Sequence, residues 1–307
     1  MIFRKKVDID FVNRFVLGQR GTDVKWGMDT VKEGSADTPI VSVIMGVYNA
    51  GDGRRLEQAV QSILAQTLQD WELIICDDGS TDGTLARLEA LSVCDERIKV
   101  ISNGTNRQLA ATLNRCIDCA RGRYIARMDD DDVSHPQRLE KQLRFMEEHS
   151  EISFCGTAAQ YFSDEGVWGR RCPPAHPTKD DFLFTNPFIH PSMIICREAL
   201  LAVGGYSEEK ITRRAEDYDL WMRLYAAGYE GANLQEILFE YREDKDSFKR
   251  RAYRYRVDEA RVRLHGFRAM GILFPTGWLY VLKPFLVGLI PSTLMRALKQ
   301  WRWKGKA

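Results

Sequence analysis

The chain lacks several features that would assign it to common protein classes. Its 307 residues contain no uninterrupted apolar run of the roughly 18–20 residues that a membrane-spanning helix needs. The seven cysteines are scattered, and the one CxxC pair, Cys116 and Cys119, has no second pair and no histidine nearby, so neither a zinc site nor a redox motif is indicated. There is no internal repeat and no low-complexity tract. The first residues are too charged for a signal peptide, so we expect a cytoplasmic location.

The chain carries its charges unevenly, although its net charge is only +1. Residues 245–307 contain 15 Lys or Arg and 3 Asp or Glu, whereas residues 1–244 contain 29 and 40. An acidic body with a basic end indicates that the two parts have different partners.

Strand-like and helix-like segments alternate along the chain. Short β-branched apolar runs, typical of buried strands, alternate with segments whose apolar residues recur at helical spacing. The predicted strands are 40–45, 71–76, 98–101 and 124–128, and the predicted helices lie near 56–64, 85–91 and 109–120. Further on, strands are expected at 153–162, 191–196 and 235–241 and a helix at 215–227. This order predicts an α/β fold with a mostly parallel, doubly wound sheet flanked by helices.

Three of the predicted strands lead into polar residues. The first is followed by Val47, Tyr48 and Asn49, the second by residues 77–83, and the fourth by four aspartates at 129–132. Such ends gather at the ligand-binding edge of an α/β sheet. Residues 77–80, taken alone, also have the pattern of an ordinary turn before a helix.

The four consecutive aspartates indicate a cation site. Adjacent carboxylates repel one another unless a positive group binds them, and their hard oxygens favour Mg²⁺ or Mn²⁺, which commonly bridge a carboxylate to a substrate phosphate. A solvated acidic turn is the alternative. The residues that follow have the pattern of a helix start, with Ser134 as N-cap, Pro136 in the first turn and Gln137 at capping-box spacing.

Six stretches together resemble the inverting family 2 glycosyltransferases, which have the GT-A fold. They are residues 39–49, 72–84, 126–132, 190–193, 204–206 and 215–221. The resemblance implies a GT-A domain over 39–242. Residues 1–38, which are polar and lack sustained periodicity, are expected to form an N-terminal extension or linker, and residues 243–307 a basic, apolar helical tail. It also implies transfer of one sugar from a nucleotide-sugar, with a UDP-sugar favoured, to a saccharide acceptor, with Mn²⁺ or Mg²⁺ as cofactor.

The resemblance also implies roles for single residues. The donor nucleotide would lie against Val47, Tyr48, Asn49, Asp78, Arg107 and Asp130. Asp129 and Asp131 match the DxD metal motif, with Asp131 as the more direct ligand. Asp217 matches the catalytic base, with Asp219 as its nearest competitor, although an acid this early in a helix is also favoured by the helix dipole alone. His190, Glu216 and Trp221 are candidates for contact with the diphosphate or the acceptor, with Trp221 as a wall of the sugar pocket and His190 equally suited to a structural role.

The C-terminal segment has the composition of a membrane-interface segment. Residues 269–282 and 284–295 carry no charge, but Pro275, Lys283 and Pro284 interrupt them, and basic and aromatic residues flank them. We therefore expect residues 245–307 to bind an anionic membrane surface and not nucleic acid. The expected location is the cytoplasmic face of the inner membrane, and the expected acceptor is a lipid-linked saccharide or an oligosaccharide in bacterial surface polysaccharide assembly. The alternative is that residues 271–290 pack against the enzyme body.

Two other functions are open on the sequence alone. A catalytically inactive nucleotide-sugar-binding protein would have no reason to keep Asp78, Asp131 and Asp217 together. A sugar nucleotidyltransferase normally needs a glycine-rich basic loop after the first strand, where this chain has residues 47–50, Val-Tyr-Asn-Ala.

Overall fold

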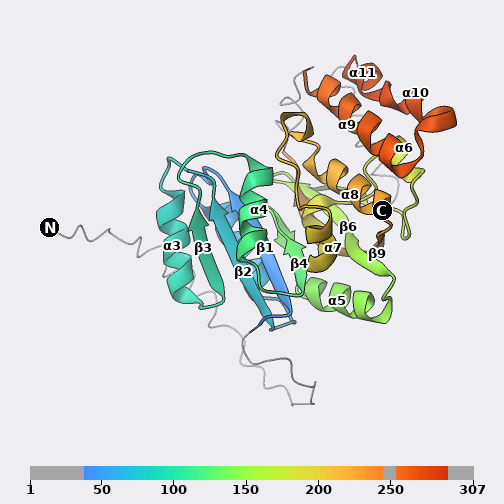
Figure 1. The fold of residues 1–307 in the computed structure, drawn as a ribbon. Coiled ribbons are helices and arrows are strands. Elements are labelled where there is room, and N and C mark those ends of the chain that lie inside the picture. Colours follow the sequence, from blue (N-terminus) through green and yellow to red (C-terminus); the bar gives the residue numbers. More distant parts are fainter. Residues whose placement is uncertain (1–37, 245–253, 290–307) are drawn as a thin grey trace.

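The computed structural model describes residues 38–244 and 254–289. Within them, one sheet of nine strands forms the centre of the molecule, and helices pack on its two faces (Figure 1). The strand order is β3-β2-β1-β4-β8-β6-β9-β5, and β7 pairs with β6 outside this path. The strands are β1 (Val41–Val47), β2 (Trp71–Asp77), β3 (Ile98–Ser102), β4 (Tyr124–Arg127), β5 (Val133–Ser134), β6 (Ile152–Ser163), β7 (Gly166–Arg171), β8 (Ile194–Cys196) and β9 (Glu230–Arg242).

The first four strands are parallel to one another wherever they pair, as the sequence predicts. β1 pairs in parallel with β2 on one side and with β4 on the other, and β3 continues the parallel part beyond β2. The second half is mixed, because β8 is antiparallel to both β4 and β6, whereas β6 and β9 are parallel. The predicted α/β class is therefore confirmed, with the parallel strands concentrated in the first half of the chain.

The helices lie between these strands, except for the last three, which follow the final strand. They are α2 (Arg54–Leu64), α3 (Thr84–Cys94), α4 (Leu109–Cys119), α5 (Arg138–Glu148), α6 (Asp181–Phe184), α7 (Arg197–Ala202), α8 (Glu216–Ala226), α9 (Arg254–Met270), α10 (Trp278–Val281) and α11 (Lys283–Gly288). Short turns of other helix types lie at His190–Ser192, Lys210–Thr212 and Leu273–Gly277.

Each face of the sheet has its own hydrophobic cluster. Alternate residues of β1 point to opposite faces, so Val43 belongs to the cluster with α2, α3 and α5, whereas Ile44 belongs to the cluster with α4, α7 and α8. A strand buried on both faces favours apolar residues at nearly every position. In residues 40–45 the one polar residue is Ser42, which is buried and whose hydroxyl donates to Glu72 Oε1 (2.7 Å).

The sheet brings the polar strand ends together. The strand order changes direction at β1, which has β2 on one side and β4 on the other. In open α/β sheets, ligands bind outside the carboxyl ends of the strands at such a point. The loops after β1, β2 and β4 therefore lie at the expected edge.

Three predicted element boundaries are wrong. The strand expected at 235–241 begins earlier, at Glu230. Ser134 does not cap a helix, because it lies in β5, where its backbone N–H donates to Ser62 Oγ (3.0 Å) and its hydroxyl accepts from Gln66 Nε2 (3.0 Å). Helix α5 starts four residues later, at Arg138. The strand expected at 191–196 is shorter, because its first residues form a helical turn at His190–Ser192 and only Ile194–Cys196 pair in the sheet.

The first part of the predicted tail packs against the body of the protein. Val262, Phe267 and Met270 of α9 are buried in the same cluster as residues of α8. The two helices approach closely, since a Cβ placed on Gly266 would lie 2.3 Å from the Met222 sulfur. Among the described helices, none is both long enough and apolar enough to span a membrane. The extension expected over 1–38, apart from Thr38, and the end of the tail from residue 290 lie outside the described residues.

Candidate functional site

The loops after β1 and β2 are tied into one unit. The Asn49 backbone N–H donates to Ser80 Oγ (2.9 Å), and Asn49 Oδ1 accepts from the Thr81 N–H (2.9 Å). Asn49 adopts φ 51°, a left-handed conformation that asparagine tolerates better than most residues. Val47 is buried, whereas Tyr48 is 48% exposed at the surface of this unit. Of the predicted nucleotide contacts, Tyr48 and Asn49 are thus available from solvent.

Asp77 and Asp78 are adjacent, but their carboxylates have different hydrogen-bond partners. Asp77 is buried, and its carboxylate accepts from the backbone N–H of Gly79 (3.2 Å) and of Ser80, which is the turn role that the sequence left open. The Asp78 carboxylate accepts from Asn103 Nδ2 (2.8 Å) and from the backbone N–H groups of Arg107 (2.7 Å) and Gln108 (3.0 Å).

Asp78 and Arg107, both predicted near the nucleotide, are therefore in contact. The Arg107 side chain is exposed, while its backbone is held by Asp78. Because a carboxylate oxygen has two lone pairs, these bonds leave Asp78 able to accept from a ligand as well.

The acidic run is anchored at its two ends. Asp129 forms an ion pair with the buried Arg127. Asp132 is buried, and its Oδ1 accepts from the backbone N–H of Arg242 on β9 (2.7 Å). The Arg242 Nε also donates to the backbone carbonyl of Asp131 (3.0 Å), so β9 fixes the backbone that carries the central acids.

The two central acids have unusual proton affinities. Burial and the neighbouring carboxylates raise the pKa of Asp130 to about 7, and burial with the charge of Asp129 raises the pKa of Asp131 to about 6. Both groups therefore hold their negative charge at a cost. The pKa of Asp132 is also raised, mainly by burial.

The acidic run fits a divalent cation only together with other ligands. Within residues 38–244 and 254–289, no group of three or more His, Cys, Asp and Glu side chains is arranged to hold a metal ion. Mg²⁺ is usually held by one or two carboxylates plus substrate phosphates and water, so the carboxylate oxygens of this run suit it in kind. The raised pKa values of Asp130 and Asp131 also favour a cation at this position, because a nearby positive charge would stabilise the ionised carboxylates and lower their pKa values.

Asp217 stands at the start of α8 and contacts a residue from another segment. Its Oδ2 accepts from Asn186 Nδ2 (2.7 Å), and its Oδ1 accepts from the Tyr218 backbone N–H (2.8 Å). Burial raises the pKa of Asp217, while the charges of Arg127 and Arg171 oppose that rise. Burial and the Asp217 charge raise the pKa of the adjacent Glu216 to about 7. A carboxylate with a raised pKa is a stronger base than a solvated one.

The buried Arg127 lies among these groups. It is 1% exposed, and its charge acts on the acidic run, on His190 and on both Glu216 and Asp217. The acids of the fourth strand end and those of α8, which are about 90 residues apart in sequence, thus share one electrostatic environment.

His190 is held in the interior by a tyrosine. Its Nε2 lies 2.8 Å from the Tyr206 hydroxyl, and burial together with the Arg127 charge lowers its pKa well below the ordinary value. His190 is therefore neutral at physiological pH and suits a hydrogen bond more than a charge contact with a diphosphate.

The expectation that Trp221 walls a sugar pocket is not supported. Trp221 is fully buried and stacks on Phe154, with ring centroids 5.4 Å apart, and it also contacts Phe188. Its position on α8 faces the hydrophobic cluster, because residue 221 lies one turn beyond Asp217 on the side that packs against the sheet.

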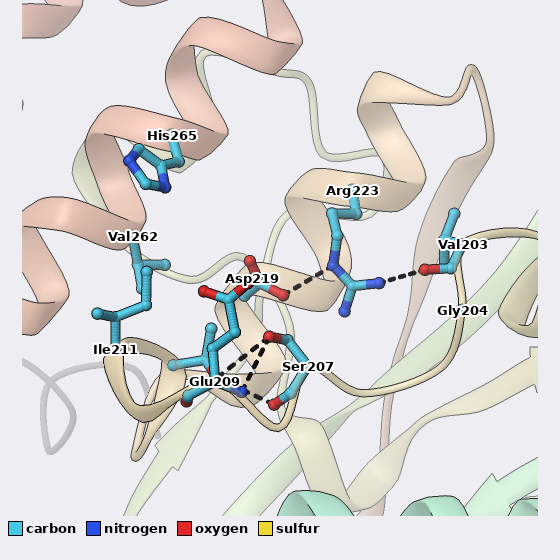
Figure 2. A pocket seen from close by; sticks show the side chains of 10 residues that line it. Val203, Gly204, Ser207, Glu209, Ile211, Asp219, Arg223, Val262 and His265 are labelled. Atoms are coloured by element: carbon cyan, nitrogen blue, oxygen red, sulfur yellow. Dashed lines mark hydrogen bonds and ion pairs between the residues drawn. The ribbon is translucent and has the colours of Figure 1, made fainter.

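Asp219, the competitor for the base, lines a cavity that does not include Asp217 or the acidic run. Its carboxylate pairs with Arg223 (2.7 Å), whose guanidinium also donates to the Val203 and Gly205 carbonyls. A cavity of about 290 Å³ lies here between α8, the 203–212 loop and α9. Figure 2 shows Asp219 and Arg223 on one side of it and Val262 and His265 on the other. The charge of Asp219 is thus already compensated by Arg223, whereas Asp217 is hydrogen-bonded to the uncharged side chain of Asn186.

Sequence reasoning gave no role to four residues of this site. They are Arg127, Arg171, Asn186 and Tyr206. Arg127 and Tyr206 fall inside matched motifs, which is the signal that could have identified them. Asn186 and Arg171 lie in a region without regular periodicity, and only the fold brings them to α8.

Comparisons with known proteins identify the family of the chain. The family model described as "Glycosyl transferase family 2" matches residues 42–204, which include the strand ends and the acidic run. EpsE of Bacillus subtilis is 43% identical over 84% of this chain and 92% of its own length. An Escherichia coli UDP-Gal:alpha-D-GlcNAc-diphosphoundecaprenol beta-1,3-galactosyltransferase is 29% identical over 84% of this chain and 94% of its own length.

Solved structures agree on the fold. The crystal structure of TarS residues 1–349 from S. aureus, in complex with UDP-GlcNAc, has a TM-score of 0.61 and 17% sequence identity, and the match covers 79% of each chain. This similarity establishes a GT-A-like fold for the chain.

Proposed function

Because this chain belongs to glycosyl transferase family 2, we propose that it transfers a single sugar, with inversion, from a UDP-sugar to a hydroxyl of a lipid-linked saccharide. The nucleotide would lie against the unit formed by the loops after β1 and β2, at Tyr48, Asn49 and Asp78. The acidic run would bind the divalent ion, and Asp217 would act as base.

The proposal is supported by one observation above all, the common environment around Arg127. A displacement at a sugar needs a cation beside the leaving diphosphate and a base beside the incoming hydroxyl. The acidic run and Asp217 meet these two needs, and both lie within the influence of the same buried guanidinium. Asp129 is its direct partner.

The proposed reaction is a single displacement. Asp131, with Asp129 beside it, would hold Mn²⁺ or Mg²⁺ against the donor diphosphate, and the ion supplies neutralisation of the charge that develops on the leaving group. Asp217 takes the proton of the acceptor hydroxyl while that oxygen bonds to the anomeric carbon. The bond from this carbon to the phosphate oxygen breaks, and its electron pair leaves with UDP. One step without a covalent intermediate inverts the configuration.

The relatives support the choice of substrates. The name of the E. coli relative specifies UDP-Gal as donor and a sugar on diphosphoundecaprenol as acceptor, and TarS was crystallised with UDP-GlcNAc. A lipid-linked acceptor places the reaction at a membrane, where we expect the cytoplasmic face of the inner membrane and a role in surface polysaccharide assembly.

The C-terminal helices offer a surface for that membrane. Leu282, Leu286 and Leu289 expose 48%, 67% and 74% of their surface, and the nearby Phe274 and Trp278 are exposed as well. Apolar side chains gathered on short helices, with basic residues in the same segment, suit insertion into a lipid interface. We therefore propose that α10 and α11 contact the membrane while α9 holds them to the body.

The test measures nucleotide binding and turnover separately. UDP binding is followed by calorimetry with MnCl₂ or MgCl₂, and UDP release is followed with UDP-glucose, UDP-galactose and UDP-GlcNAc. Asp131→Ala should weaken UDP binding in the presence of metal. Asp217→Asn should bind UDP with normal affinity but should produce UDP from the UDP-sugar at least roughly 100-fold more slowly. Asp219→Asn, on the same helix but paired with Arg223 and away from the proposed site, is the matched control and should remain active.

Two results would contradict the proposal. Full activity of Asp217→Asn would remove the base from the mechanism. Binding of UDP-sugars without any turnover, by the wild type with either metal and an oligosaccharide or lipid-linked acceptor, would favour the inactive binding protein.

A further inference from the structure

The carboxylate of Asp217 is held by a side chain in a fixed orientation. Asn186 Nδ2 donates to Asp217 Oδ2 (2.7 Å), while Asn186 Oδ1 accepts from the backbone N–H of Phe188 (3.1 Å). The second bond determines which end of the amide faces the carboxylate, because only the oxygen can accept from an N–H. Asn186 therefore presents a donor, and never an acceptor, to Asp217.

The segment that carries Asn186 is anchored on three sides. The Asn186 carbonyl accepts from Arg171 Nη2 on β7 (2.5 Å), and the Pro187 carbonyl accepts from Asn233 Nδ2 on β9 (3.2 Å). Phe188 is 1% exposed, and its ring lies 5.5 Å from that of Trp221. Since Trp221 and Asp217 belong to the same helix, this aromatic contact fixes the distance between Asn186 and the base.

We propose that Asn186 is a positioning residue, which turns the Asp217 carboxylate toward the acceptor hydroxyl and keeps it ionised in its half-buried place. A hydrogen bond to the charged form of an acid favours that form, whereas burial disfavours it. Asn186 cannot take the proton itself, because an amide has no basic site at neutral pH. It therefore supports proton transfer without competing for the proton.

Arg171 acts in the same direction through the backbone of this segment. Its guanidinium binds the Asn186 carbonyl, and its charge opposes the rise in the pKa of Asp217. The fully buried Trp221, which we expected at a sugar, serves the base instead by fixing Phe188.

This inference rests on the proposed function, in which Asp217 is the base, and the test separates the two. Asn186→Ala and Asn186→Asp are compared in the full chain with Gln235→Ala. Gln235 is a matched amide on β9, which donates to the Pro173 and Asn233 carbonyls and does not touch Asp217. UDP release is measured from whichever of UDP-glucose, UDP-galactose and UDP-GlcNAc the wild type cleaves fastest.

A positioning role predicts a specific set of changes. Asn186→Ala should lower kcat roughly 10- to 100-fold, as expected for a misplaced base, while the Kd of UDP with MnCl₂ stays within about twofold of the wild type. In the plot of kcat against pH, the acidic limb of this variant should lie at higher pH than that of the wild type. Asn186→Asp should move that limb further, because a second carboxylate beside Asp217 opposes its ionisation. Gln235→Ala should keep both kcat and the profile.

A readout that does not require turnover completes the test. The ¹³C-carboxyl signal of Asp217, assigned by its absence in Asp217→Asn, is titrated in the wild type and in Asn186→Ala, and its midpoint should be higher in the variant. The inference is overturned if the midpoint and the pH profile are unchanged, or if kcat falls only in parallel with thermal stability. If instead Asp217→Asn keeps full activity, the proposed function fails, whatever Asn186 does.

Discussion

Arg127 holds a full positive charge in the interior, next to the Asp129 carboxylate and within the field of Glu216 and Asp217. Removing one partner of a buried ion pair leaves the other charge uncompensated, which typically costs roughly 3–5 kcal/mol. The buried Arg127 Nε also has no hydrogen-bond partner among the described residues. Its retention in the core is thus better explained by the site than by stability.

Arg127→Met should therefore destabilise the protein by roughly 3 kcal/mol, and MnCl₂ should restore part of the loss. A divalent ion on the acidic run would replace the missing positive charge, so Mn²⁺ should raise the Tm of this variant by more than that of the wild type. Thermal unfolding with and without MnCl₂ measures both effects, and Arg127→Lys, which keeps the charge, is the control. An equal Mn²⁺ effect on all three proteins would show that the guanidinium and the metal do not share a site.

Glu216 makes the stability of the protein depend on pH. Its pKa is about 7 in the folded chain, against an ordinary value of 4.5. Because the unfolded chain loses this proton more readily, raising the pH from about 4.5 to about 7 favours unfolding, and the full penalty applies above pH 7. This difference between the folded and unfolded pKa values of Glu216 lowers the free energy of unfolding by about 3 kcal/mol at most.

Glu216→Gln should accordingly raise the free energy of unfolding by up to about 3 kcal/mol at pH 8 and by less than about 1 kcal/mol at pH 5. Urea unfolding of the variant and the wild type at the two pH values measures this change in the free energy of unfolding. Glu148→Gln, an exposed acid of α5, is the control. The same stabilisation at both pH values would mean that burial does not perturb Glu216.

Helix α8 connects the base to the hydrophobic core. Its first turn carries Glu216 and Asp217, and its next turn carries Trp221, which packs between Phe154 and Phe188. The position of the base therefore depends on how this helix packs against β6 and the 186–188 segment.

Trp221→Ala should destabilise the protein by roughly 3–5 kcal/mol, since it leaves a large cavity, and Trp221→Phe should cost less. Neither should change the Kd of UDP, because the ring is buried away from solvent. Urea unfolding and calorimetry separate these effects. Unchanged stability together with a raised KM for the sugar donor would restore the original expectation of a sugar contact.

The helices and strands that the sequence predicts correctly are those whose pattern follows from burial. β1 and β2 are covered on both faces, so they appear as largely apolar runs, in which the buried Ser42 and Glu72 bond to each other. Their polar ends mark the site edge. Ser134 was misplaced because a helix cap and a buried strand end use the same hydroxyl, and its partners Ser62 and Gln66 are about 70 residues away. Trp221 could not be assigned either, because an aromatic residue in an amphipathic helix suits a core and a pocket equally well.

The parts of the site that could not be predicted from the sequence depend on contacts between distant segments. The acids at 129–132 and at 216–217 are recognisable as motifs, but the pairing of Asn186 with Asp217 joins residues 31 positions apart through a segment without periodicity. The packing of α9 on α8 depends on the missing side chain of Gly266 against Met222, which no periodicity predicts.

The molecule as a whole combines an acidic catalytic body with a C-terminal segment that is anchored at one end and apolar at the other. Phe267 and Met270 of α9 are buried against the body, whereas the leucines of α10 and α11 and those beside them are exposed. A truncation before α9 ends would therefore remove part of the core together with the proposed membrane surface. Substitutions on the exposed side test the surface alone.

The double variant Leu282→Glu, Leu286→Glu should bind membranes at least roughly ten-fold more weakly than the wild type, because it loses apolar insertion and adds repulsion from anionic lipids. Sedimentation with vesicles of phosphatidylcholine and phosphatidylglycerol measures the partition, and pure phosphatidylcholine vesicles isolate the charge effect. Val93→Glu is the matched control, since Val93 on α3 is 87% exposed and belongs to the other end of the sheet. UDP release from the soluble donor should be unchanged in both variants, because all three side chains are exposed at the surface and none belongs to the proposed site. If the double variant still sediments as the wild type does, α10 and α11 are not the membrane contact.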